Sequence, residues 1–300
     1  MTVRIAFAGT SEFALPSLAA CIEACDVAAV ITQPDKPGSR GKPAPRPVAD
    51  LASQHAIPLL QPRKIRDAEV VEQILGYRID AFVVASFGQI ISDDLLNKPR
   101  FGGVNVHPSL LPRWRGASPV AAAILAGDKV TGVCIMKMDA GLDTGPVYAR
   151  SKRQIAPSDT TVSLQAELAS EGATMLVDTM QRLEAGTAAA QPQTEVGVTH
   201  VRRFVKADGV VDWSRDDAAK VDRMVRGLNP WPGVTAVIRD VEVKLLSGEV
   251  SDVSLAPGVV DAPAKDQVVV GTSAGSYRVI DLQPAGKRPM NAADFLRGLK

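Results

Sequence analysis

Three polar residues stand at positions where an open sheet could use them for chemistry. Asn105 and His107 lie two positions apart at the end of an apolar run, and Asp143 lies in the glycine-bracketed segment Gly-Leu-Asp-Thr-Gly. Residues two apart on a strand project to the same side. Because ligands of open α/β sheets bind beyond the carboxyl ends of the strands, we expect the three side chains to meet at one end of the sheet, if the strands are parallel.

Asn, His and Asp together suit acyl transfer to an amine. The amine must be neutral, an oxyanion must be stabilised, and a proton must reach the leaving nitrogen. Asn105 can donate a hydrogen bond to the oxyanion, His107 can move protons near neutral pH, and Asp143 can orient the imidazole and accept a proton. No Ser or Cys stands as an obvious nucleophile, which favours direct attack by the amine.

Other interpretations of these residues are open at this point. Taken separately, each is more often structural, as a histidine at a strand end, an asparagine cap or a turn aspartate. A metal site is not predicted, since no H-x-x-x-H or C-x-x-C pattern occurs. The first turn, residues 9–13, lacks the second and third glycines of a dinucleotide site, and no phosphate-binding G-x-x-x-x-G-K-[ST] occurs.

The composition is that of an ordinary globular chain of two domains. The 300 residues are 46% hydrophobic and 22% charged, and 34 basic against 33 acidic residues give a net charge of +1. This balance disfavours wholesale electrostatic wrapping of nucleic acid, although a local basic patch is compatible with it. Three cysteines without a C-x-x-C pair fit a reducing cytoplasm. No window predicts a membrane helix or a signal peptide.

The hydrophobic pattern changes about two thirds of the way along the chain. Before that point apolar runs alternate with helical patterns, which predicts an open, mostly parallel α/β sheet. Its expected strands are residues 4–8, 27–32, 57–60, 81–85, 103–107 and 131–138, and its expected helices are 16–24, 48–55, 67–75, 117–126 and 161–184. Later short strands at 241–245, 267–270 and 276–282, with a helix at 216–226, predict a small β-barrel. We expect domains over residues 1–187 and 205–300, joined by a linker over 188–204.

The stretch Asn-Val-His-Pro-Ser-Leu-Leu-Pro at residues 105–112 resembles the signature of the formyltransferases that use 10-formyltetrahydrofolate to formylate an amine. Gly-Leu-Asp-Thr-Gly is similar to the loop that carries their carboxylate. The resemblance implies Asn105, His107 and Asp143 as catalytic residues, 10-formyltetrahydrofolate as formyl donor, no metal, and a Rossmann-like sheet. We expect the wall of the folate site, with a cis bond before its last residue, to be formed by Ser109, Leu110, Leu111 and Pro112.

The flanking segments are similar to the branch of this family that formylates charged initiator tRNA. They are residues 4–14, 32–42, 115–119, 208–213 and 229–233, the last two in a C-terminal domain that is OB-like in that branch. The resemblance implies transfer of formyl to the amino group of methionyl initiator tRNA, which supports translation initiation. The products would be formylmethionyl-tRNA and tetrahydrofolate.

The expected tRNA contacts lie in a basic loop and at the domain junction. Residues 33–47 carry four basic residues against one acid, and a mobile basic loop suits a phosphate backbone and an unpaired acceptor end. The loop is shorter than the family usually has, and an arginine replaces the expected junction lysine. Trp213 and Trp231 lie in apolar segments and are interpreted as core residues. The candidate tRNA-binding residues are Lys36, Arg40, Lys42 and Arg203.

Two other functions stay open from the sequence. The catalytic motif alone would equally serve a formyltransferase acting on a small amine, such as glycinamide ribonucleotide or an amino sugar nucleotide. An RNA-binding module without catalysis is disfavoured by the intact Asn105, His107 and Asp143. A monomer is the default expectation, and the sequence does not define the tRNA identity elements.

Overall fold

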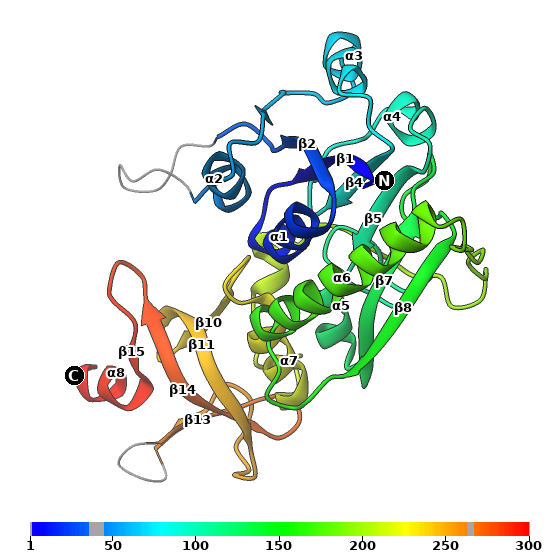
Figure 1. Ribbon diagram of the computed structural model, residues 1–300. Coiled ribbons are helices and arrows are strands. Elements are labelled where there is room, and N and C mark those ends of the chain that lie inside the picture. Colours follow the sequence, from blue (N-terminus) through cyan, green and yellow to red (C-terminus); the bar gives the residue numbers. More distant parts are fainter. Residues whose placement is uncertain (1, 36–44, 263–266, 300) are drawn as a thin grey trace. The chain divides into compact units, whose positions relative to one another are not determined.

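The computed structural model describes residues 2–35, 45–262 and 267–299 (Figure 1). The chain divides into two compact units. Unit 1 comprises Met1–Pro119, Val130–Gln154 and Gln165–Val201, and unit 2 comprises Val120–Lys129, Ile155–Leu164 and Arg202–Lys300.

Unit 1 is built on a seven-stranded sheet with the order β3-β2-β1-β4-β5-β7-β8. The five strands from β3 to β5 pair in parallel, which confirms the mostly parallel α/β sheet. Every residue of β4 and β5 is buried, as expected for strands covered on both faces. The strands are β1 (Arg4–Gly9), β2 (Asp26–Ile31), β3 (Leu59–Leu60), β4 (Ala81–Ala85), β5 (Gly102–His107), β7 (Val130–Lys137) and β8 (Val147–Gln154).

The last two strands of this sheet run antiparallel. β7 pairs antiparallel with β5, so that Lys137 lies opposite Val104 and Cys134 lies opposite His107. We expected Asp143 to meet Asn105 and His107 if the strands that precede them, β7 and β5, run in parallel. This condition is wrong, because β7 ends at the edge of the sheet where β5 begins. β8, which the sequence did not predict, pairs antiparallel with β7. Its first residue, Val147, is buried, and from Ala149 onward half-buried and exposed residues alternate.

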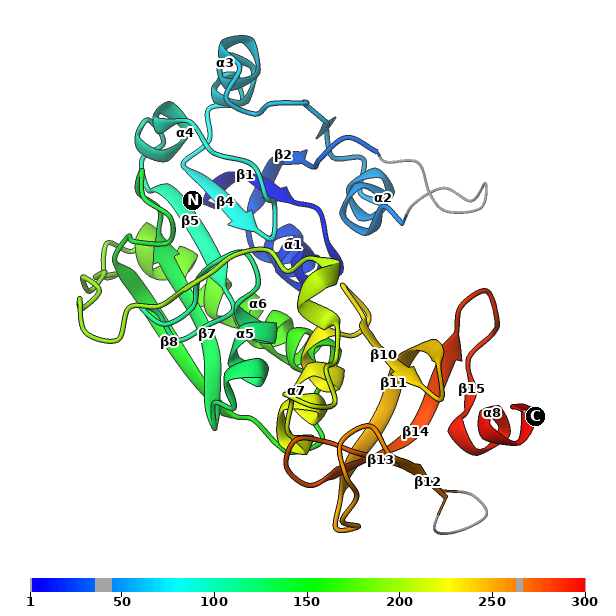
Figure 2. The ribbon, with the colours of Figure 1, turned by 180° about the vertical axis from the view of Figure 1, so that it is seen from behind.

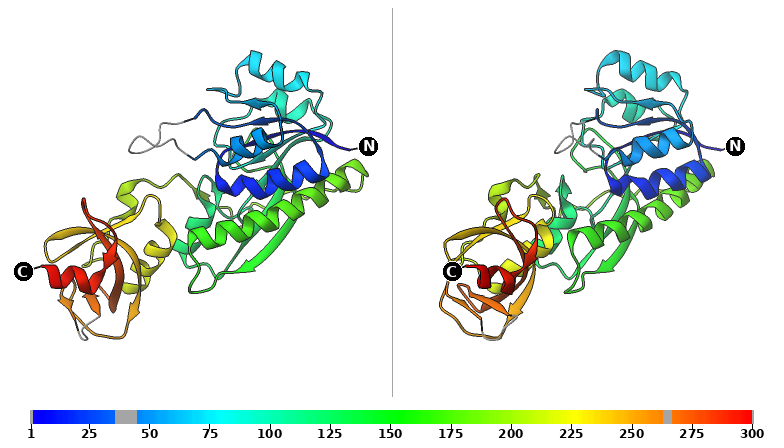
Figure 3. Two further views of the ribbon diagram at one scale, coloured as in Figure 1. Left: turned by 60° about the vertical axis from the view of Figure 1, so that its left-hand side comes forward. Right: turned by 90° about the vertical axis from the view of Figure 1, so that its left-hand side faces the viewer.

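Helices cover both faces of the sheet of unit 1. Figure 3 shows α1 (Leu15–Ala24) and α6 (Thr161–Glu184) on one face and α3 (Ala68–Gly76) on the other. α6 begins at a capping box, in which Thr160 and Ser163 each accept the other's backbone N–H. It ends before Gly186, whose φ of +70° is the conformation that stops a helix. The remaining helices of unit 1 are α2 (Pro47–Gln54) and α4 (Asp93–Asn97), with the 3-10 turn η1 (Glu12–Ala14).

Unit 2 contains an antiparallel sheet, with β12 next to β13 at one edge (Figure 2). The strand order is β10-β11-β14-β13-β12, and β15 also pairs with β14. This confirms an antiparallel β-domain at the C-terminal end. Its elements are α5 (Pro119–Ala126), η2 (Lys206–Gly209), α7 (Ala218–Leu228), β10 (Val234–Ile238), β11 (Val241–Ser251), β12 (Val260–Asp261), β13 (Val268–Gly271), β14 (Ser276–Pro284), β15 (Met290–Asn291) and α8 (Ala292–Gly298).

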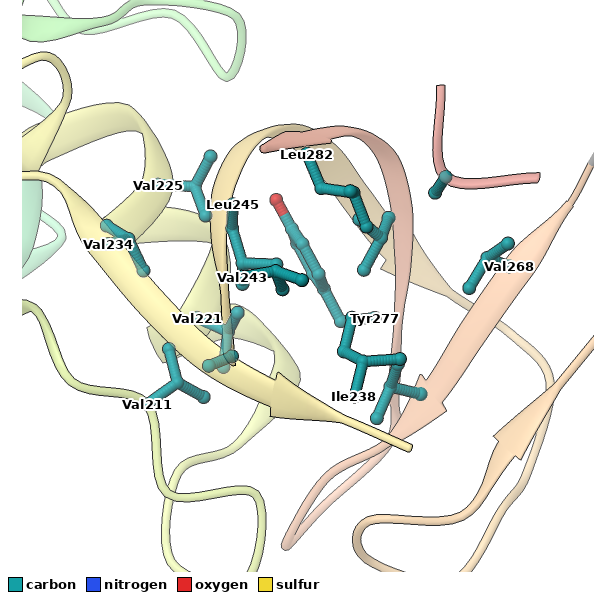
Figure 4. Close-up of a cluster of buried hydrophobic side chains, with 14 of the residues drawn as sticks. Val211, Val221, Val225, Val234, Ile238, Val243, Leu245, Val268, Tyr277 and Leu282 are labelled. Atoms are coloured by element: carbon teal, nitrogen blue, oxygen red, sulfur yellow. The ribbon is translucent and has the colours of Figure 1, made fainter. Parts of the chain in front are cut away.

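Tyr277 of β14 is the largest fully buried side chain among the residues that the structure describes. Figure 4 shows its ring among Val243, Leu245, Ile238 and Leu282. A Cβ at position 248 would lie 2.5 Å from the ring atom Cε1 of Tyr277, so Gly248 leaves the space that the ring fills. The buried cluster of unit 2 thus contains aromatic side chains, Trp213, Tyr277 and Phe295, among its aliphatic ones.

The two tryptophans of unit 2 differ in burial. Trp213 is buried, and its Nε1 donates to the carbonyl of Val237 at 2.8 Å. Trp231 is 63% exposed, so its interpretation as a core residue is wrong. It lies in a turn that Asn229 ties down, since Asn229 Nδ2 donates to the carbonyls of Val225 and Leu245. The apolar sequence around Trp231 did not reveal that the turn directs this side chain to solvent.

The described helices include none that is long and apolar enough to cross a membrane. Across the same residues, no group of three or more His, Cys, Asp or Glu side chains is arranged to hold a metal ion.

Candidate active site

Asn105 and His107 lie on one face of β5 at its carboxyl end. They are 8% and 4% exposed, and their antiparallel partners on β7 are Met136 and Cys134. The opposite face is occupied by α6, where a Cβ at Gly172 would lie 2.7 Å from Cγ1 of Val106. The alternation of the strand therefore gives the helix its apolar residues and leaves the polar pair on the other side.

The imidazole of His107 is fixed by a backbone carbonyl. Nε2 lies 3.1 Å from the carbonyl oxygen of Trp114. Because a carbonyl can only accept, we assign the proton of the neutral ring to Nε2. Nδ1 then carries a lone pair, and it faces Oδ2 of Asp143 at 3.7 Å. This distance is longer than a hydrogen bond. An N–H donor placed between Nδ1 of His107 and Oδ2 of Asp143 could therefore donate to both atoms.

Asp143 reaches His107 from a loop that returns over the sheet. β7 ends at Lys137, beside the start of β5, and the chain must fold back before β8 begins at Val147. Asp143 itself has a φ of +54°, and its Oδ2 accepts the backbone N–H of Gly116 at 2.8 Å. The structure thus brings Asp143 to His107, but by a folded-back loop and not by two parallel strands.

Close backbone approach shapes this loop. A Cβ at Gly145 would lie 1.9 Å from the carbonyl oxygen of Lys137, and one at Gly116 would lie 2.2 Å from that of Val201. Asp139 closes the turn, since its Oδ1 accepts from Thr144 Oγ1 at 2.7 Å. The two glycines let the carboxylate of Asp143 and the N–H of Gly116 meet.

The segment after His107 is a tight turn that contains all four residues expected to contact folate. Ser109 is fully buried, and its Oγ donates to the carbonyl of Arg113 at 2.6 Å. The Leu111–Pro112 bond is cis, as expected. Leu111 packs with Cys134, Met136 and Val147. Burial raises the pKa of the Cys134 thiol to about 11. Leu110 is partly exposed and is the more accessible of the two leucines.

Two further residues, not singled out from the sequence, support the site. Arg115 is buried, and its Nε and Nη2 both donate to Oε1 of Gln193, at 3.2 and 2.9 Å. Gln193 lies in a stretch without hydrophobic periodicity, so nothing in its local sequence marks it. Gly116, which follows Arg115 in β6 (Arg115–Gly116), pairs with β9 (His200–Val201). The local signals at this strand are the glycine and the resemblance of residues 115–119 to the family.

The expected tRNA contacts are only partly covered by the structure. Lys36, Arg40 and Lys42 lie outside the described residues. Arg203 is described and exposed, and its carbonyl accepts from Arg202 Nη1 at 3.0 Å. Arg202 also forms a bidentate pair with Asp208, which lowers the pKa of that carboxyl.

Comparison with known proteins places this geometry in a family. Residues 3–180 match the formyl transferase family, and residues 203–300 match the formyl transferase C-terminal domain. Among solved structures, the sugar 3N-formyl transferase WlaRD, determined in the presence of dTDP and 5-N-formyl-THF, is similar with a TM-score of 0.70. It is 17% identical, and the match covers 96% of this chain and 100% of WlaRD, which shows a shared fold.

The chain belongs to the formyl transferase family. Two of its relatives show which branch of this family it resembles. It is 41% identical to the methionyl-tRNA formyltransferase of Agathobacter rectalis over 300 residues, 99% of this chain and 96% of that protein. It is 43% identical to that of Aromatoleum aromaticum over 298 residues, 99% and 94% of the two chains. Within the formyl transferases, it is therefore a member of the methionyl-tRNA formyltransferase family.

Proposed function

We propose that this protein transfers the formyl group of 10-formyltetrahydrofolate to the amino group of methionyl initiator tRNA, with Asn105, His107 and Asp143 as its catalytic residues. Full-length similarity to methionyl-tRNA formyltransferases supports the reaction. The observation that carries the residue assignment is the pair of His107 and Asp143, held on the face of the sheet that also presents Asn105.

The roles of the three residues follow from their surroundings. When bound, the folate supplies a formyl carbon attached to nitrogen; the new C–N bond to the amine forms and the old one breaks. The amine must lose a proton and the leaving nitrogen must gain one. His107 Nδ1 can accept the proton of the amine, because Nε2 is held by the carbonyl of Trp114, and the same Nδ1–H can then give a proton to the leaving nitrogen of the folate. The Asp143 carboxylate stabilises the positive ring that results, and Asn105 donates to the oxygen that becomes negative.

The turn at residues 108–112 suits the flat heteroaromatic ring of a folate. The Leu110 side chain is partly exposed, whereas Leu111 and Ser109 are buried and hold the turn in place. Two prolines stiffen the backbone, whose polar groups can face the edge of such a ring. We therefore assign Ser109, Leu110, Leu111 and Pro112 to the folate wall.

The RNA contacts that we propose are Lys36, Arg40, Lys42 and Arg203. Arg203 and Lys206 are exposed in unit 2, and an RNA backbone attracts such cations. η2 packs directly against the turn that carries the exposed Trp231, because a Cβ at Gly209 would lie 1.9 Å from the carbonyl of Gly233. Exposed cations and an exposed aromatic ring in the same unit suit RNA, and a tRNA substrate implies action in the cytoplasm.

The test compares acceptors and variants in one assay. We expect wild-type protein to formylate methionyl initiator tRNA with 10-formyltetrahydrofolate, and free small amines far more slowly. Asp143→Asn should lower turnover by about 10²- to 10⁴-fold, since it removes a positioned proton-transfer group. Rapid formylation of an amino sugar nucleotide, with none of tRNA, would instead support the small-amine enzyme.

A separate measurement tests the RNA side. Arg203→Ala should weaken tRNA binding and reduce the slope of affinity against salt, because one fewer counterion is released. Folate binding should not change. Arg239→Ala, an exposed arginine in the turn between β10 and β11, serves as the control for a general loss of charge. An equal salt slope in wild type and Arg203→Ala would remove Arg203 from the contacts.

A further inference from the structure

Gln193 makes four hydrogen bonds through one side-chain amide in unit 1. Its Oε1 accepts from Nε and Nη2 of Arg115 at 3.2 and 2.9 Å. Its Nε2 donates to the carbonyls of Asp143 and Gly145, both at 2.8 Å. A guanidinium can only donate and a carbonyl can only accept, so the amide has a single orientation that satisfies all four bonds.

These bonds connect the two backbone segments that hold the Asp143 carboxylate. Arg115 precedes Gly116, whose N–H binds Oδ2 of Asp143 at 2.8 Å. One of the two carbonyls that Gln193 binds belongs to Asp143 itself. The side chain of Asp143 is therefore bound to the backbone of β6, and its backbone is tied to the same strand through Gln193 and Arg115.

Asp143 needs such support because of its backbone conformation. A φ of +54° is sparsely populated by residues other than glycine, and it persists only where the surroundings hold it. If the loop relaxed toward negative φ, the peptide would rotate and the carboxylate would turn away from His107. The 3.7 Å between Oδ2 and His107 Nδ1 depends on this conformation.

We propose that Gln193 is a positioning residue for Asp143, which clamps the Asp143 loop to the buried Arg115 and so sets the distance from the carboxylate to His107. The inference rests on the proposed catalytic role of Asp143. The hydrogen bonds of Gln193 go to Arg115 and to backbone carbonyls, so it acts through the Asp143 backbone. The part of Gln193 that does this is the amide N–H₂ group, since that group binds the loop carbonyls.

Three substitutions separate the parts of this interaction. Gln193→Leu keeps the approximate size and removes all four hydrogen bonds. Gln193→Glu keeps an acceptor for Arg115 but turns a carboxylate oxygen toward two carbonyl oxygens. Gln191→Leu is the matched control, because Gln191 lies two positions earlier, is exposed, and pairs with Val147 through its backbone.

We expect Gln193→Leu and Gln193→Glu to lower kcat by about 10- to 100-fold with KM for tRNA little changed, since a misplacement of about 1 Å can cost 10²-fold. Gln191→Leu should keep wild-type kcat. All variants should keep the wild-type melting temperature to within a few degrees. If only Gln193→Leu were impaired and Gln193→Glu were normal, the amide N–H₂ would not be the working group and the proposal would fail.

A double-mutant cycle with Asp143→Asn distinguishes positioning from general damage. A residue that acts through the carboxylate should cost little more once that carboxylate is gone, so the two losses should be strongly non-additive. If the fold-loss of kcat in the double variant equals the product of the two single fold-losses, Gln193 is merely structural and the inference is overturned. Normal turnover of Asp143→Asn alone would instead overturn the proposed function, so the two failures are distinguishable.

Discussion

The polar site of unit 1 and the apolar core of unit 2 are held in different ways. In unit 1, His107, Arg115 and Asp143 each bond to a named backbone or side-chain partner, and each bond sets a direction. In unit 2, Tyr277 is fully buried, and among the described residues its hydroxyl has no hydrogen-bond partner. The site therefore depends on orientation, whereas the core depends on volume.

The largest expected effect lies at the site. His107→Ala should lower turnover by about 10²- to 10⁴-fold, because it removes the group that we propose as the proton carrier. Single-turnover formylation of tRNA measures this loss. His55→Ala, at an exposed position after α2, is the control and should be near normal. Turnover of His107→Ala within a factor of three of wild type would make the histidine structural.

A truncated side chain in the core of unit 2 should lower stability and leave the chemical rate unchanged. Leu282→Ala removes a fully buried side chain that packs near Tyr277 (Figure 4), and such changes cost about 2–5 kcal/mol of stability. Denaturant unfolding measures the cost, with Val250→Ala on the exposed side of β11 as the control. At low temperature, where the protein stays folded, the chemical step should keep its wild-type rate. A slowed chemical step there would contradict the separation of site and core.

The hydroxyl of Tyr277 tests whether the core of unit 2 depends on side-chain volume or on hydrogen-bond direction. Burial raises the pKa of this phenol, and Tyr277→Phe keeps the ring while it removes a polar atom without a partner among the described residues. The change in the free energy of unfolding should lie within about 1 kcal/mol, and it should favour Phe. A loss of about 2 kcal/mol or more would reveal a bond that orients the ring.

The smallest effect concerns a polar pair outside the site. The hydrogen bonds of Arg202 and of the Val205 N–H lower the pKa of Asp208. A lowered carboxyl pKa stabilises the fold at pH values above the unfolded pKa of ~3.9, and this is lost as the pH falls through the folded pKa. Asp208→Asn should therefore lower the melting temperature slightly at pH 7, with the gap closing toward pH 3. A difference in melting temperature that stays constant between pH 7 and pH 3 would show that the charge of Asp208 does not stabilise the fold.

Local patterns were sufficient for much of the fold of unit 1. The apolar runs at β1, β4 and β5 predict buried strands because every residue of a doubly covered strand avoids water. The long helix α6 was predicted with its bounds, since Gly186 marks its end. β8 was missed because its outer residues are charged and it lies at the edge of the sheet. α8 was missed as a short helix of seven residues, and β10 was missed although its sequence VTAVI is β-branched and its inner residues alternate with outer ones.

The sequence by itself determined which residue types are available: Asn105 and His107 on one face of a strand, a glycine-bracketed Asp143, and a rigid proline turn. Their spacing fixes these features through short-range geometry. The tertiary structure decided that β7 runs antiparallel and that Asp143 returns over the sheet to the N–H of Gly116. It also decided that Gln193 binds Arg115, 78 positions away in the chain. Strand direction and such contacts depend on packing between distant segments, which no local pattern records.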